Sequence, residues 1–214
     1  MDFAQFLHYF IGLIVISNPL SALPALLRIT RNRSLSEKRK TGLTTALAVL
    51  IILLVATWVG TPLLKILGIE LPAFQVSGGI IIFLMSLSML NAEESPIKQT
   101  IEEKKDQRPG DIGAIVPLAM PIIAGPGVIS TIIINVNQFP GMYNLALLSI
   151  SAILVSILMG ILLYFASSLE QILGQLGINI INRLGGLILA AISIQMLATG
   201  LIGLFPILKF TFPT

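Results

Sequence analysis

Two stretches of this sequence, GGIIIFLMSLSML at residues 78–90 and GGLILAAISIQML at residues 185–197, share six identities in thirteen positions without a gap. Unrelated segments would share roughly one. The stretches are 107 residues apart, and at the same shift Pro19 falls on Pro126. Apolar helices align easily, and glycine pairs also serve helix packing, so this similarity alone could arise by chance. The evidence for a repeat is that two separate regions match at the same shift. We infer that the chain is built from two related halves.

The composition around these stretches is that of a membrane protein. The chain is 55% hydrophobic and 11% charged, whereas a soluble domain carries about 25% charged residues. Such a chain lacks the polar side chains to cover its own surface, so lipid has to be part of its solvent. This argues against a nucleic-acid-binding face, which would need helices that are not wholly apolar. Cysteine is absent, which excludes disulfides and thiolate metal sites.

Uncharged runs of about 20 residues mark the membrane spans. One run, Ile112–Leu169, is too long for a single helix and is divided by Asn137-Gln138-Phe139-Pro140-Gly141. The first run follows Met1-Asp2, which lacks the basic start of a signal peptide, so we expect it to be retained as a span. The other uncharged runs are Phe3–Leu27, Thr41–Leu64, Leu71–Ala92 and Leu184–Leu208. The sequence therefore predicts six transmembrane helices.

The basic residues predict the orientation. Of the 13 basic residues, 11 lie in the loop after the first span, in the polar linker between the halves, or before the last span. Only Lys65 and Lys209 fall on the opposite side. Because basic loops stay in the cytoplasm, both termini are predicted to lie outside. Three spans per half then force the second half to run inverted, which is typical of secondary transporters. The predicted division is 1–92 for the first repeat, 93–111 for a cytoplasmic linker and 112–214 for the second repeat.

Two spans contain helix-breaking residues at corresponding positions. Ser17-Asn18-Pro19-Leu20-Ser21 interrupts the first span, and Ala124-Gly125-Pro126-Gly127 interrupts the fourth. Proline removes a helical hydrogen bond, and Asn18-Pro19 is also typical of a helix start. Unwound backbone in a membrane has to be buried in protein or line a wet cavity. The alternative is a plain proline kink in each span.

If these spans are two half-helices each, their ends form a binding site. N–H groups at the start of the second half-helix attract a carboxylate, and carbonyls freed at the end of the first attract an ammonium group or a cation. The predicted substrate-binding residues are Asn18, Pro19, Leu20, Ser21, Ala124, Gly125, Pro126, Gly127 and Val128. We expect valine at Gly125 or Gly127 to fill this site, and Asn18→Ala to weaken binding, without unfolding the protein.

Other polar or small residues are weaker candidates. Ser17, Ser77, Gly78, Asn182 and Gly185 are candidates for lining a cavity, although small residues in membrane helices more often serve close packing. His8 is a candidate proton relay, but a lone histidine near a helix start is more often interfacial, so its role stays open. The spans contain no Asp or Glu. No catalytic, cofactor or metal motif occurs, and we expect no enzyme activity.

These segments resemble the MarC family of prokaryotic inner-membrane proteins, which is grouped with small neutral amino-acid transporters. The resemblance is carried by Asn18-Pro19, by IVPLAMPIIAGPGVIST at 115–131, and by the glycine pairs that open the repeated stretches. It covers essentially the whole chain outside the central linker. It implies six spans, an outward N-terminus and uptake of glycine- or alanine-like substrates. It also implies that the broken first and fourth helices form the site.

The leading functional expectation is therefore a secondary transporter in the inner membrane of a prokaryote, with a small neutral amino acid as substrate. The small residues at the breaks disfavour lysine, glutamate and tryptophan as substrates. Coupling to Na⁺ or H⁺ is left open, as are the direction of transport and the oligomeric state. The alternatives are a channel or exporter for other small solutes and a non-transporting membrane scaffold.

Overall fold

Every element of the computed structural model is a helix in the residues that the structure describes, which are 1–30, 33–91, 124–205 and 207. The elements are α1 (Phe3–Ser17), η1 (Pro19–Ser21), α2 (Ala22–Ile29), α3 (Leu35–Ile66), α4 (Leu71–Leu90), α6 (Pro126–Gln138), α7 (Met142–Tyr164) and α8 (Ala166–Leu204). The all-helical fold class is therefore confirmed over these ranges.

Four helical segments are long and apolar enough to cross a membrane: α3, α4, α7 and the part of α8 from Leu176 to Leu204. The helices α1 and α6 have only 15 and 13 residues. At about 1.5 Å per residue they fall short of the roughly 30 Å hydrocarbon core. The six spans therefore stay a prediction. So do the inverted repeat as a whole and its division at 93–111, because this linker lies outside the described residues.

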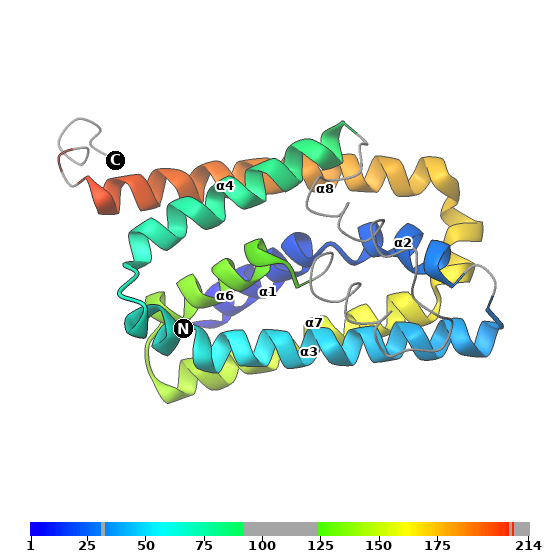
Figure 1. The fold of residues 1–214 in the computed structure, drawn as a ribbon, viewed down its shortest axis with the longest axis horizontal. Coiled ribbons are helices and arrows are strands. Elements are labelled where there is room, and N and C mark those ends of the chain that lie inside the picture. The colour runs from blue at the N-terminus through cyan, green and yellow to red at the C-terminus, as the bar shows by residue number, and fades with distance from the viewer. Residues whose placement is uncertain (31–32, 92–123, 206, 208–214) are drawn as a thin grey trace.

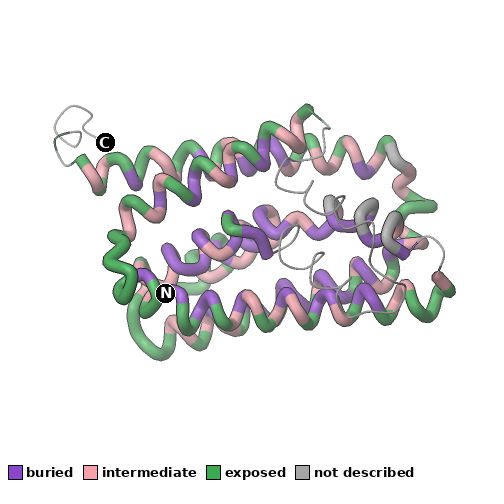
Figure 2. The backbone as a smooth tube through the Cα atoms, in the orientation of Figure 1, coloured by how far each residue is buried: buried purple, intermediate pink, exposed green. Residues whose placement is uncertain are grey.

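The outer surface of the helices is apolar, as lipid contact requires. Leu43, Leu47, Ile51 and Val55 follow one another every four residues along α3, and each is half exposed or more. Residues four apart share one face of a helix, so they form a continuous apolar stripe. Figure 2 shows exposed residues along the outer sides of the long helices and buried ones toward the centre.

The helices lie side by side and alternate in direction. α1 begins at the same end of the molecule at which α8 ends, while α3 and α4 run back and forth between the two ends (Figure 1). The Met1 amino group also donates a hydrogen bond of 3.0 Å to Asn144 Oδ1 at the start of α7. The start of α1, the start of α7 and the end of α8 thus lie at one end of the bundle.

Local sequence explains most of the helix ends. Asp2 and Gln5 form a capping box at the start of α1, as Ser34 and Glu37 do at the start of α3. Each box satisfies N–H groups that the first turn leaves free. Gly141 adopts φ 110° between α6 and α7, a conformation that favours glycine. The predicted break at Asn137–Gly141 is thus confirmed.

The predicted last span, Leu184–Leu208, falls largely on the segment Leu176–Leu204, which is long and apolar enough to cross a membrane. Helix α8 begins earlier, at Ala166, but it consists of two helical parts that meet at a kink at Gly174, which has a non-helical φ of 60° and ψ of 173°. The prediction ended the loop after Arg183, but Arg183 is an exposed residue within the helix. A helix does not have to end where the apolar run ends, because a long basic side chain can extend toward the membrane surface. The helix also stops at Leu204, before the predicted Leu208.

The two repeated stretches pack against each other reciprocally. A Cβ placed on Gly79 of α4 would lie 3.1 Å from Ser193 O of α8, and one on Gly186 of α8 would lie 3.1 Å from Ser86 O of α4. The 107-residue shift converts the first contact into the second. Gly78 meets Met196 Cε and Gly185 meets Met89 Cε in the same way. The antiparallel α4–α8 pair therefore has internal two-fold symmetry in its contacts.

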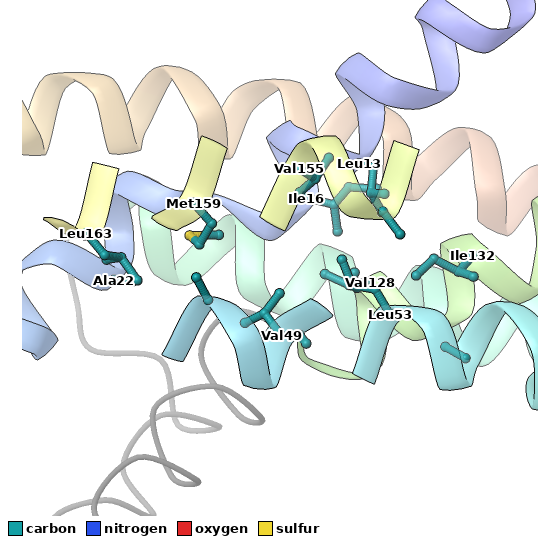
Figure 3. Packing of buried hydrophobic residues seen from close by; sticks show 14 of the residues in the cluster. Leu13, Ile16, Ala22, Val49, Leu53, Val128, Ile132, Val155, Met159 and Leu163 are labelled. Carbon is teal, nitrogen blue, oxygen red and sulfur yellow. The ribbon is translucent and has the colours of Figure 1, made fainter. Parts of the chain in front are cut away.

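The remaining helices share a buried apolar core. Figure 3 shows side chains of α1, α2, α3, α6 and α7 converging in it. Leu13 and Ile16 come from α1, Leu53 from α3, and Val128 and Ile132 from α6, and none of them is more than 2% exposed. This core holds the short helices α1 and α6 beside the long ones.

Candidate functional site: two helix ends beside helix α4

The first predicted break is present. Helix α1 ends at Ser17, and Asn18 takes the left-handed conformation with φ 39° and ψ 70°. Its N–H still donates to Ile14 O at 3.0 Å. The chain then forms the short 3-10 turn Pro19–Ser21 before α2 resumes at Ala22. Proline disfavours the helical conformation of the preceding residue, and asparagine is among the few non-glycine residues that adopt the left-handed one readily.

The second predicted break is described on one side only. Gly125 is extended, with φ −69° and ψ 177°, and α6 begins at Pro126. Proline suits the first helical position because its missing N–H would have no partner there. Residues 92–123 lie outside the described ranges, so the half-helix predicted before Gly125 is not described. The start of a helix at Gly125-Pro126 is confirmed.

The hydrogen bonds of the first turn of α6 indicate which of its N–H groups could bind an anion. The Gly125 carbonyl accepts both the Val128 N–H at 3.0 Å and the Ile129 N–H at 3.2 Å. Pro126 has no N–H. The Gly127 N–H is therefore the first donor of α6 that this carbonyl does not engage. An anion at this helix start would contact Gly127 rather than Val128.

Helix α4 brings the two helix ends together. The Asn18 side-chain nitrogen donates to Met89 Sδ at 3.4 Å. A Cβ placed on Gly127 would lie 2.7 Å from Ile82 Cγ1 and 3.8 Å from Met85 Sδ. Since positions 82, 85 and 89 are spaced by three and four residues, they share one face of α4. The end of α1 and the start of α6 therefore both contact this face of α4.

The residues of this site are mostly enclosed. Pro19, Ala124, Gly125, Gly127 and Val128 are buried, Asn18 and Leu20 are half-buried, Pro126 is exposed, and the Ser21 side chain lies outside the description. Ser17 is 1% exposed, and its hydroxyl oxygen has no hydrogen-bond partner within the described ranges. A buried hydroxyl without a partner is costly.

The weaker candidates occupy different places in the fold. Ser77 is exposed, and its hydroxyl donates to Phe74 O at 3.0 Å. Gly78 and Gly185 pack tightly at the α4–α8 contact, and Gly78 also approaches Ser130 Oγ of α6. Asn182 Oδ1 is buried without a partner in the described part of the chain. His8 is exposed on α1. Of these residues, Gly185 lies nearest to Asn18, because both contact Met89.

Gly127→Val has a different physical meaning from the one expected. Valine was predicted to fill an open binding site, but the space beside Gly127 is occupied by Ile82. The substitution would therefore clash first with the Ile82 side chain of α4. Ile82, Met85 and Met89 are site residues that the sequence analysis missed. The identity of Met89 and Met196 in the repeat was the available signal.

Comparisons with known proteins identify the family of the whole chain. The family model described as "MarC family integral membrane protein" matches residues 3–205. A UPF0056 membrane protein of Buchnera aphidicola is 36% identical over 96% of this chain and 95% of its own length. The UPF0056 membrane proteins YhcE of Escherichia coli and YvbG of Bacillus subtilis are each 33% identical, over 96% and 97% of this chain and 95% and 99% of their own lengths. No solved structure matches the chain significantly.

Proposed function

The chain belongs to the MarC family of integral membrane proteins, and we propose that it is a secondary transporter of small neutral amino acids. The observation that carries the proposal is the meeting of the end of α1 and the start of α6 on one face of α4. Secondary transporters bind their substrates where discontinuous helices expose backbone groups near the middle of the membrane.

The chemistry of the site favours a zwitterion of small size. Pro19 has no N–H to donate to the carbonyl of Val15, four residues earlier, so this part of α1 presents an acceptor suited to an ammonium group. The start of α6 presents the Gly127 N–H and the positive end of the helix dipole to a carboxylate. The spans hold no acidic residue, so the proposed site uses backbone groups and the Asn18 amide.

The proposed setting is the inner membrane of a prokaryote, with both termini outside. A coupling cation, Na⁺ or H⁺, is the additional partner that this class of transporter would use. Coupling through a buried carboxylate is disfavoured, because no Asp or Glu lies within the predicted spans.

Uptake by the purified protein in proteoliposomes tests the proposal. We expect saturable uptake of radiolabelled glycine and alanine, with sodium and pH gradients imposed separately to identify the coupling ion. Unlabelled lysine, glutamate and tryptophan should not compete. Non-saturable flux would indicate a channel, and saturable efflux of a different solute would indicate an exporter. No flux of any small solute from well-folded protein would favour the scaffold.

A further inference from the structure

An apolar groove lies on the lipid-facing side of the α3–α7 pair. Small residues let these helices approach closely: a Cβ placed on Gly42 would lie 2.9 Å from Leu163 O, and one on Gly160 would lie 3.4 Å from Ala46 Cβ. The groove above this contact has a volume of about 380 Å³ and is walled by Leu43, Leu47 and Leu50 of α3 and by Ile157 and Ile161 of α7. None of the Asn18 and Gly127 site residues lines it.

The groove continues into a basic pocket at the N-terminal end of α3. This second hollow, of about 560 Å³, is lined by Ser36, Arg39, Lys40 and Thr44, and it shares Leu43 and Tyr164 with the apolar groove. The shared residues make one continuous surface, apolar toward the middle of the membrane and basic at its end.

Arg39 is held at this junction by an aromatic ring. Its guanidinium carbon lies 4.6 Å from the centroid of the Tyr164 ring, which is cation–π distance. Its Nε atom is buried and has no hydrogen-bond partner among the described residues. The guanidinium group is planar and always charged, which suits it to a phosphate group.

We infer that this surface binds an anionic phospholipid, with the headgroup phosphate at Arg39 and Lys40 and an acyl chain along the apolar groove. Charge complementarity selects the headgroup, and basic pockets between membrane helices are known to bind anionic lipid headgroups. A soluble anion would leave the apolar half unused, and an apolar peptide would leave the basic half unused. The inference is independent of the proposed transport.

Native mass spectrometry of the full-length protein in detergent tests the site. The probes are phosphatidylglycerol, phosphatidylcholine with the same acyl chains, and inorganic phosphate as a competitor. We expect the half-saturating concentration of phosphatidylglycerol to be about fivefold or more below that of phosphatidylcholine, since each basic residue near a membrane surface contributes about this factor. Phosphate at the same concentration should displace no lipid.

Two variants and a matched control assign the site. Arg39→Gln and Lys40→Gln should each raise the half-saturating concentration of phosphatidylglycerol about fivefold. Lys40 is exposed, so this second variant keeps the test decisive if Arg39→Gln fails to fold. Lys38→Gln removes the same charge from the same turn of α3 but from a residue that lines neither hollow, and it should change nothing.

Several results would overturn the inference. Equal affinities for the two lipids would show that the surface does not select an anionic headgroup. Displacement by phosphate would assign a soluble anion instead. Wild-type affinity in both glutamine variants would place the lipid elsewhere, and failure of the wild-type protein to bind phosphatidylglycerol would indicate that another segment covers the groove.

Discussion

Asn18 combines a backbone role and a side-chain role, and substitutions can separate them. Its φ of 39° is the only positive φ of a non-glycine residue in the described ranges. We expect Asn18→Gly to keep the midpoint of thermal unfolding in detergent, because glycine adopts this conformation freely. Asn18→Ala should lower stability by about 1 kcal/mol, because alanine lacks the short polar side chain that lets asparagine tolerate the left-handed conformation.

Both variants remove the amide that contacts Met89 and, in the proposed function, orients the substrate. Glycine uptake should therefore fall in Asn18→Gly although the protein is as stable as the wild type. Undiminished uptake by this variant would show that the Asn18 amide does not bind the substrate. In Asn18→Ala alone, a loss of uptake could come either from backbone strain or from the missing amide.

The contact between Gly127 and Ile82 makes a second prediction at the residue scale. Gly127→Ala should destabilise the protein by about 1–3 kcal/mol through overpacking, because its Cβ would lie 2.7 Å from Ile82 Cγ1. The double variant Gly127→Ala with Ile82→Ala should recover part of this loss. A double-mutant cycle of unfolding midpoints measures the coupling, and strictly additive effects would contradict the packing described.

At the scale of whole helices, the reciprocal α4–α8 contact predicts matched effects in the two halves. Gly79→Ala and Gly186→Ala should each lower stability by about 1–3 kcal/mol, since each added Cβ meets the partner backbone at 3.1 Å. Gly12→Ala is the control, because nothing lies within 4 Å of its Cβ position. It should be neutral or stabilising by up to about 1 kcal/mol. A large effect at only one of Gly79 and Gly186 would contradict the symmetry.

The helices also show what the sequence can and cannot predict. Proline and glycine act on their own backbone, so the end of α1 and the starts of α6 and α7 were predictable from Pro19, Pro126 and Gly141. The early start of α8 at Ala166 was not, because exposed charged residues such as Arg183 are compatible with either a loop or a helix surface. The placement of Met89 beside Asn18 depends on packing between segments 71 residues apart, which no local pattern specifies.

For the molecule as a whole, the membrane orientation can be measured directly. The chain contains no cysteine, so a single introduced cysteine reports its own side. We expect Ser36→Cys and Ser168→Cys to react only with membrane-permeant reagents in intact cells. Glu70→Cys should react with impermeant ones, because the basic loops are predicted to lie inside. These three residues are exposed at helix ends. Labelling of all three from the outside would contradict the predicted orientation.

The self-matching contacts of α4 and α8 bear on how the molecule could change state. A symmetry relation exchanges the contacts that α4 and α8 make with each other. Tilting α4 against α8 and tilting α8 against α4 therefore bring equivalent atoms together. Gly79 against Ser193 and Gly186 against Ser86 are such an equivalent pair. If the two tilts are close in energy, a small differential interaction, such as one bound solute, would be enough to shift the population from one to the other. Near-degeneracy of two opposite arrangements is the thermodynamic condition for opening alternately to either side of a membrane.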